Sequence, residues 1–248
     1  MDETSYRSAL THYLLQFLND RRKELLFNDI SIRTRHLCLV LEDFYHPHNI
    51  SAAIRTSDCF GLMDIHIVEN SIHYERNPGI NKGSDKWMRV VRYTKESFNT
   101  PACLTALREK GYQIVATSPH EGSVDLRSLD IRQKTAIVMG AESYGISDYV
   151  KENADAFIRI DTPGFTESLN VSVAAGIILE NLNYRMRNEP DINWQLTNDD
   201  RDQLLIQNLA KMVDDVDLLE VQFRERNQIT SPDRVFERKP ARRSTEIH

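Results

Sequence analysis

Short apolar segments alternate with amphipathic segments between residues 36 and 187, and this alternation constrains the fold more than any other feature of the sequence. Runs such as residues 37–41 and 136–139 have the length of a buried strand, whereas the segments between such runs carry apolar residues at helical spacing. This pattern favours a mainly parallel sheet with helices on both faces, because parallel strands need long crossover connections. The predicted strands cover residues 36–41, 64–69, 88–93, 112–117, 135–139 and 156–160, and the predicted helices between them cover residues 50–60, 100–111 and 168–187, with a short helix that starts at Ser147.

Predicted helices also flank this α/β block on both sides. Apolar residues recur at helical spacing over residues 4–26, and a last helix is predicted from Thr197 to about residue 217. We therefore expect three parts, which are an N-terminal helical extension over residues 1–35, an α/β domain over residues 36–187, and a C-terminal helix with a basic tail over residues 188–248.

The composition excludes several classes of protein. Hydrophobic residues make up 40% of the chain and charged residues 27%, as in an ordinary globular protein. No apolar run approaches the roughly 20 residues that a helix needs to cross a bilayer. The start, Met1-Asp2-Glu3, does not resemble the basic start of a secretory signal, so the expected compartment is the cytoplasm.

The cysteines and histidines favour neither a disulfide framework nor a metal site. Cys38, Cys59 and Cys103 are widely spaced and form no C-x-x-C pair, so we interpret them as buried structural thiols. His46 and His48 lie close together, but no third ligand has a recognisable spacing, so we predict no metal.

The net charge of −6 argues against a chain that coats nucleic acid without specificity, but positive charge is concentrated in two segments. Residues 72–95 and 221–248 are both locally basic, whereas residues 196–220 are acidic. Such segments are typical either of a solvated charged surface or of a surface that contacts phosphates. Under the second interpretation, the candidate phosphate-binding residues are Lys82, Lys86, Arg89, Arg242 and Arg243.

Three segments with unusual polar residues follow predicted strands, at the edge where parallel sheets bind their ligands. They are residues 49–55, residues 140–145 and residues 162–170. Each also has a plain structural interpretation, namely helix capping with an ion pair, a strand-to-helix turn, and capping with close helix packing. Taken singly, none of the three defines an activity.

The middle segment, Gly140-Ala-Glu-Ser-Tyr-Gly145, resembles the glycine loop that binds dinucleotides, but Glu142 replaces the central glycine. A carboxylate in this position would face the pyrophosphate, so the loop is better suited to an uncharged or cationic ligand. This departure disfavours a nicotinamide-dependent dehydrogenase. Ser143 lies in A-E-S-Y-G instead of G-x-S-x-G, which disfavours a serine hydrolase.

Together and in order, the three segments resemble the motif set of the SPOUT-class RNA methyltransferases of the TrmH (SpoU) type. The matching stretches are LVLEDFYHPHNISAAIRTSDCFG from residue 39, IVMGAESYGIS from residue 137 and IDTPGFTESLNVSVAA from residue 160. The flanking helices and the stretch KGSDKW from residue 82 further resemble the tRNA guanosine-2′-O-methyltransferase subgroup. The sequence departs from the family pattern at Ile160-Asp161-Thr162, where the family usually has Ile-Pro-Met.

The resemblance implies a fold and an activity. The expected fold is an α/β sheet with a deep trefoil knot at its C-terminal end, and the expected assembly is a homodimer. The expected reaction transfers a methyl group from S-adenosylmethionine to a ribose 2′-oxygen of RNA and releases S-adenosylhomocysteine. The subgroup is that of tRNA (guanosine(18)-2′-O)-methyltransferase, which acts in the D-loop. Two alternatives stay open, which are a ribosomal RNA 2′-O-methyltransferase of the same family and a non-catalytic RNA-binding protein of the same fold.

The resemblance also assigns roles by position. The residues that match catalytic positions are Asn49, Arg55, Glu142, Ser168 and Asn170, and those that match the cofactor pocket are Thr117, Gly140, Ile160 and Leu169. The family assigns proton removal to the arginine that matches Arg55, although a guanidinium normally stays protonated. Two hypotheses follow: Arg55 is desolvated and paired so that its neutral form becomes accessible, or it grips the adjacent phosphate and stabilises the developing alkoxide as a cation.

Overall fold

The computed structural model describes residues 2–71, 87–119, 122–165 and 168–236. The chain forms two compact units, one of which comprises Ile32–Gln195. The other combines Met1–Ser31 with Leu196–His248. All the strands of the described residues belong to the first unit.

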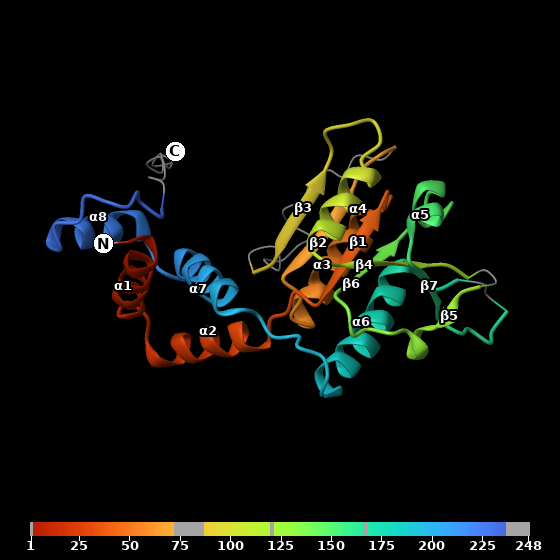
Figure 1. Ribbon diagram of the computed structural model, residues 1–248, viewed down its shortest axis with the longest axis horizontal. Coiled ribbons are helices and arrows are strands. Elements are labelled where there is room, and N and C mark those ends of the chain that lie inside the picture. Colours follow the sequence, from red (N-terminus) through yellow and green to blue (C-terminus); the bar gives the residue numbers. More distant parts are fainter. Residues whose placement is uncertain (1, 72–86, 120–121, 166–167, 237–248) are drawn as a thin grey trace, which may run out of the picture. The chain divides into compact units, whose positions relative to one another are not determined.

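In the described residues, seven strands form one parallel sheet in the order β3-β2-β1-β6-β4-β7-β5 (Figure 1). The strands are β1 (Leu37–Glu42), β2 (Asp64–Val68), β3 (Arg89–Tyr93), β4 (Gln113–Thr117), β5 (Val124–Asp125), β6 (Thr135–Met139) and β7 (Ala156–Arg159). Leu39 of β1 pairs with Ile65 of β2 on one side and with Ile137 of β6 on the other. Because β1, β6, β4 and β7 are consecutive neighbours, the segments that leave their carboxyl ends meet at one edge of the sheet.

Helices cover both faces of this sheet. They are α3 (Pro47–Cys59), α4 (Thr100–Glu109), α5 (Asp148–Asn153) and α6 (Val171–Asn188), with a short 3₁₀ turn at Leu126–Ser128. The pleat of β1 divides its side chains between two buried clusters: Leu39 and Leu41 pack with residues of α3 and α6, whereas Cys38 and Val40 pack with residues of α4 and α5. The predicted parallel sheet with helices on both faces is thus confirmed.

The second unit is helical in its described residues. Its helices are α1 (Glu3–Leu15), α2 (Asp20–Ile32), α7 (Asn198–Met212) and α8 (Val216–Arg226). Tyr6, Leu10 and Leu14 are fully buried at helical spacing on α1. The hydroxyl of Tyr6 donates a 2.6 Å hydrogen bond to the buried carboxylate of Glu220 on α8, so the first and last helices of the unit are tied together.

The flanking helices are each divided where one continuous helix was predicted. The prediction of a single helix over residues 4–26 is wrong, because the Asn19 side chain accepts a hydrogen bond from the backbone N–H of Arg22 (2.9 Å) and caps a second helix, α2. The prediction of a single helix up to about residue 217 is also wrong. Asp215 adopts a left-handed conformation (φ 48°) between α7 and α8.

Two helix starts also differ from the prediction. α3 starts at Pro47, so Asn49 lies in its first turn and is not its cap. α6 does not start at Ser168 but after Asn170, whose side chain caps it by accepting a 2.9 Å hydrogen bond from the backbone N–H of Ser172. The side chain of Asn49 is therefore available for a contact outside its own helix.

The three cysteines are free thiols, two of them in one buried cluster and one exposed. Cys38 and Cys103 are buried as expected, but Cys59 at the end of α3 is exposed, so the interpretation of Cys59 as a buried thiol is wrong. Burial raises the pKa of Cys103 to about 12, and burial also raises the pKa of Cys38. Both buried thiols therefore stay protonated at neutral pH.

His66 on β2 is buried, and its titration couples the stability of the sheet to pH. Its Nδ1 lies 3.1 Å from the Tyr93 hydroxyl, and burial lowers the pKa of His66 to about 4. The unfolded chain takes up this proton near pH 6.5, whereas the native protein does so only near pH 4, so stability present at neutral pH is lost as the pH falls through this window. We expect this group alone to lower the free energy of unfolding by about 3 kcal/mol between about pH 7 and about pH 4.

Urea unfolding across this pH range measures the effect. In His66→Gln, the part of the pH dependence that belongs to His66 is expected to disappear. His36, whose pKa is also lowered by burial, remains in the variant and keeps its own smaller contribution. An identical pH dependence for the wild type and the variant would contradict this assignment.

Candidate active site

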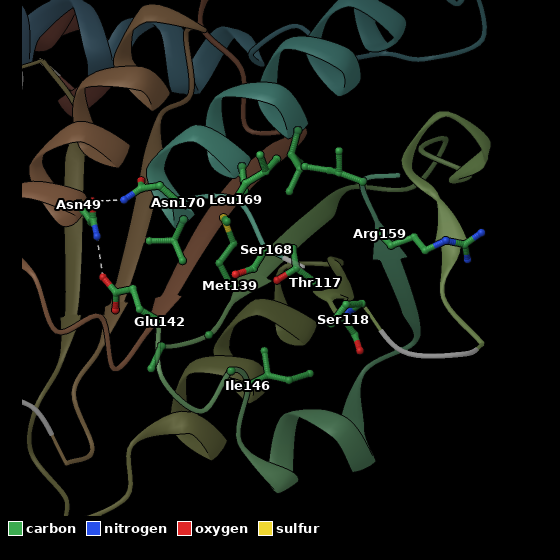
Figure 2. Close-up of a pocket in the computed structure, with 18 of the residues that line it drawn as sticks. Asn49, Thr117, Ser118, Met139, Glu142, Ile146, Arg159, Ser168, Leu169 and Asn170 are labelled. Carbon is green, nitrogen blue, oxygen red and sulfur yellow. Dashed lines mark hydrogen bonds between the residues drawn. The ribbon is translucent and has the colours of Figure 1, made fainter. Parts of the chain in front are cut away.

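A cavity of about 700 Å³ lies at the carboxyl edge of the sheet (Figure 2). Its walls come from the segments that follow β4, β6 and β7 and from the first turns of α3 and α6. This is the edge at which the sequence predicts a ligand site. The volume lies within the range of small-molecule and cofactor sites.

One wall of the cavity carries a directed chain of hydrogen bonds (Figure 2). Asn49 Nδ2 donates to Glu142 Oε1 (2.7 Å), and Asn170 Nδ2 donates to Asn49 Oδ1 (3.3 Å). Asn170 Oδ1 accepts from the backbone N–H and the hydroxyl of Ser172 (2.9 and 2.6 Å). The backbone N–H of Tyr45 donates to Glu142 Oε2 (3.2 Å). The three motif segments are thus joined through their side chains.

This chain of hydrogen bonds fixes both asparagine amides. Each amide donates through its nitrogen and accepts through its oxygen, so reversing either one would place two donors or two acceptors face to face. At one end the ionised carboxylate of Glu142 can only accept, and at the other end the backbone N–H of Ser172 can only donate. The orientation of Asn49 and Asn170 is therefore set by neighbours that have no alternative role.

Glu142 brings a negative charge to the rim of the cavity. Burial raises the pKa of Glu142, but hydrogen bonds from Asn49, from its own backbone N–H and from the backbone N–H of Tyr45 outweigh burial and bring the pKa below its ordinary value. The carboxylate is therefore ionised at neutral pH. It favours a ligand that carries positive charge over one that carries phosphate.

Gly140 allows two backbone segments to approach closely in the loop that carries Glu142. A Cβ at Gly140 would lie 2.1 Å from the carbonyl carbon of Gly145 and 2.2 Å from the nitrogen of Ile146. Ala141 and Gly145 close the loop with two reciprocal backbone hydrogen bonds (3.0 and 2.9 Å). Gly145 has a φ of 72°, which side-chain-bearing residues rarely adopt. The geometry of this loop thus requires both glycines.

Most of the predicted site residues line this cavity. They are Asn49, Glu142, Ser168 and Asn170, which are predicted as catalytic, and Thr117, Gly140, Ile160 and Leu169, which are predicted to bind the cofactor. Arg55 differs from them: its side chain is exposed on α3, and in the described part of the chain it is not among the residues that line the cavity. The structure therefore gathers the two asparagines and the glutamate but leaves Arg55 outside the cavity.

Arg89 is the one predicted phosphate-binding residue that lies within the described residues. It lies on β3, and its guanidinium donates two hydrogen bonds to the buried carboxylate of Asp64 on β2 (2.7 and 2.9 Å). Its side chain remains half-exposed, so Arg89 combines a structural ion pair with an accessible charge. The other predicted residues, Lys82, Lys86, Arg242 and Arg243, lie outside the described residues.

The cavity also includes residues that the motifs do not single out. Ser118 and Arg159 lie on the side opposite Asn49 and Glu142 (Figure 2). Arg159 Nε donates to the carboxylate of Asp161 (3.0 Å), one of the two residues that depart from the family pattern. The feature of the sequence that points to these two residues is their place at the carboxyl ends of strands, because Ser118 follows β4 and Arg159 ends β7.

The described residues contain no group of three or more His, Cys, Asp or Glu side chains that could hold a metal ion. In that same part of the chain, each helix is too short or too polar to cross a bilayer.

The parallel α/β fold and the three-segment cavity define a class of protein. Residues 36–180 match the model of the SpoU rRNA Methylase family, and this match covers more than half of the chain and all three motif segments. The chain belongs to this family.

Several named proteins resemble this chain in sequence or in structure. The tRNA (guanosine(18)-2′-O)-methyltransferase of Borreliella burgdorferi is 33% identical over 207 residues, which cover 84% of this chain and 93% of that protein. The enzyme of the same name from Escherichia coli is 33% identical over 162 residues, which cover 65% of this chain and 69% of that protein. The crystal structure of the A. aeolicus TrmH/SpoU tRNA modifying enzyme has a TM-score of 0.68 at 29% identity and covers 78% of this chain and 98% of that chain. An AdoMet-bound rRNA methyltransferase from Sinorhizobium meliloti has a TM-score of 0.52 at 28% identity over 64% of this chain and 59% of that chain.

Proposed function

We propose that this protein transfers a methyl group from S-adenosylmethionine to a ribose 2′-oxygen of RNA, and that its substrate is guanosine 18 in the D-loop of tRNA. The observation that carries the proposal is the cavity in which three motif segments meet and are joined through Asn49, Glu142 and Asn170. The names of the relatives from Borreliella burgdorferi and Escherichia coli support the choice of tRNA. The AdoMet-bound relative supports the choice of donor.

The cavity suits S-adenosylmethionine in size and in charge. Its volume of about 700 Å³ can hold a nucleoside with an amino-acid tail. The ionised Glu142 at the rim favours the positive charge of a sulfonium. Because Gly140 has no side chain, a ligand can approach the loop backbone closely, with Ile160 and Leu169 on the other walls. When bound, the donor supplies a methyl group on a positively charged sulfur.

The residues of the hydrogen-bonded wall are proposed to hold the ribose. Asn49, Glu142 and Asn170 offer donors and an acceptor at the rim, where a sugar hydroxyl can bind. Ser168 lines the same cavity immediately before α6. Their task is to keep the 2′-oxygen near contact distance of the methyl carbon and in line with its bond to sulfur, which supplies much of the rate enhancement in such a transfer.

Arg55→Lys separates the two hypotheses for Arg55. The base hypothesis requires a desolvated side chain, but Arg55 is exposed on α3, so the structure favours the hypothesis in which its guanidinium grips a phosphate. We expect Arg55→Lys to lose about tenfold in kcat/KM with an unchanged pH–rate profile, because lysine keeps the charge but loses the two-pronged contact. A pH–rate profile displaced to lower pH in the lysine variant would contradict the cation hypothesis and support the base.

Methylation of bulk tRNA with labelled S-adenosylmethionine, followed by nucleoside analysis, tests the proposed function. The expected product is 2′-O-methylguanosine in tRNA. A base-methylated nucleoside, or label in ribosomal RNA alone, would overturn the choice of tRNA. An absence of any transfer would favour the non-catalytic RNA-binding alternative.

We further propose that the protein acts as a homodimer and that the C-terminal part of its sheet is knotted as in the family. An exposed apolar face on α6 supports the dimer: Val173, Ile177 and Tyr184 are 51%, 39% and 66% exposed. Apolar surface of this kind is typical of a protein interface. Sedimentation at micromolar concentration checks the assembly, and a monomer would contradict it.

The parts of the chain are proposed to divide the work. Residues 36–187 carry the methyl transfer, and the flanking parts over residues 1–35 and 188–248 extend the contact with tRNA. The basic segments over residues 72–95 and 221–248 are proposed to bind phosphates, which supply affinity without reading the sequence of the RNA. The proposed compartment is the cytoplasm.

A further inference from the structure

We propose that Tyr45 is a stacking site for an unpaired RNA base beside the cavity. This inference rests on the proposed function, because it names one contact of the same RNA substrate. Tyr45 lies between β1 and α3, and its side chain is 65% exposed. The next residue, His46, lines the cavity. A large aromatic ring is thus presented to solvent at the rim of the site.

The position of Tyr45 is fixed from two directions. Its backbone N–H donates to Glu142 Oε2 (3.2 Å), which ties this segment to the loop after β6. Its ring meets the ring of His46 edge to face, with centroids 4.9 Å apart and an interplanar angle of 82°. A ring that is already supported in this way loses little conformational freedom when a planar ligand stacks on it.

The chemistry of the rim favours a nucleobase as the occupant. In the proposed function the ribose lies against Asn49 and Glu142, and the base is attached to the carbon next to the one that carries the 2′-oxygen. The base must therefore lie beside this rim, where Tyr45 is tied to Glu142. The Glu142 carboxylate repels phosphate, so the uncharged part of the nucleotide is the part that suits this side. Proteins that recognise single-stranded RNA commonly stack unpaired bases on tyrosine rings.

Tyr45→Leu and Tyr45→Trp test this inference, with the binding of unmodified tRNA measured over a range of salt concentrations. Leucine keeps an apolar side chain without an aromatic face, and we expect it to weaken tRNA binding about tenfold at every salt concentration. The slope against salt is expected to stay unchanged, because stacking releases no counterions. Tryptophan keeps an aromatic face and is expected to retain tRNA affinity within about twofold of the wild type.

A matched control variant and two further measurements distinguish stacking by Tyr45 from a general effect of losing an exposed aromatic ring. Phe98 is 42% exposed and also meets another ring edge to face, that of Tyr149 (5.9 Å, 82°), but it does not line the cavity. Phe98→Leu is therefore expected to leave tRNA affinity unchanged. The affinity of Tyr45→Leu for S-adenosylhomocysteine and its sedimentation behaviour are both expected to match those of the wild type.

Four other results would each contradict the proposal that Tyr45 stacks on an RNA base. Unchanged tRNA affinity in Tyr45→Leu would do so directly, while the wild-type protein would still methylate tRNA and the proposed function would stand. An equal loss of S-adenosylhomocysteine affinity would make the ring a structural support of the cavity. A changed oligomeric state would assign the ring to contact with a second copy of the chain, and a changed salt slope would assign its effect to phosphates. Failure of the wild type to methylate any tRNA would instead be a failure of the proposed function.

Discussion

Gly140→Ala is expected to weaken donor binding strongly, because the substitution leaves the loop that carries Glu142 no room to close. The new methyl group would lie 2.1 and 2.3 Å from the carbonyl carbon and oxygen of Gly145 and 2.2 Å from the nitrogen of Ile146. These are all backbone atoms, which cannot rotate aside as the end of a flexible side chain can. Ala141 and Gly145 are also held by two reciprocal hydrogen bonds, so the loop must open at the wall of the cavity.

We expect the affinity for S-adenosylhomocysteine, measured by calorimetry, to fall about 100-fold or more, and the midpoint of thermal unfolding to fall as well. Gly164→Ala is the matched control. Gly164 also lies in a motif segment that follows a strand, but a Cβ there would meet no atom within 4 Å. The control is therefore expected to keep donor affinity. Retained affinity in Gly140→Ala would show that this loop is not part of the donor site.

The central strands β1 and β6 could be predicted most directly, because each is a short, mostly apolar run. β1 and β6 lie buried in the middle of the sheet, and such strands read as continuous apolar runs. β5, at Val124–Asp125, is too short to carry any period and escaped prediction for that reason. The division between α1 and α2 could not be predicted, because the apolar spacing of the sequence continues through Asn19, the residue that caps α2.

The members of the site could be predicted, but their contacts could not. The motif resemblance singles out Asn49, Glu142 and Asn170, and the structure places all three on the cavity. Their hydrogen bonds join residues 93 and 121 positions apart in the chain, and no local pattern encodes such pairs. The first bond arises because β6 pairs beside β1, so that the segments after these strands meet. The second arises because α3, which carries Asn49, and α6, which Asn170 caps, pack in one buried cluster.

The role of Asn49 shows why a local interpretation fell short. Asparagine before an apolar run is a typical helix cap, and on that pattern the helix was predicted to start at Ile50. The helix instead starts at Pro47, since proline fits a first turn, where its missing N–H is not needed. That difference moves Asn49 into the helix and directs its amide to Glu142 instead of to its own backbone.

Glu142→Gln is expected to lower the rate of methyl transfer about 100-fold, although glutamine has nearly the same shape. The carboxylate of Glu142 accepts hydrogen bonds from both Asn49 Nδ2 and the backbone N–H of Tyr45. A glutamine amide has one acceptor oxygen, so in either orientation its NH₂ group faces a donor. Asn49→Asp is expected to cost a similar factor, because two carboxylates would then face each other across 2.7 Å.

The double variant, Glu142→Gln with Asn49→Asp, separates the effect of the hydrogen bonds on activity from the effect of the position of the negative charge. The glutamine nitrogen can donate to the new aspartate, the glutamine oxygen can accept from Tyr45, and the second aspartate oxygen can accept from Asn170. Every hydrogen bond is then satisfied, but the negative charge has moved from the loop after β6 to α3. We expect the double variant to match the wild type in donor affinity and thermal stability and to exceed either single variant about tenfold in kcat. If the two single losses simply multiply, the residues act independently, and the hydrogen-bonded chain is not what positions them.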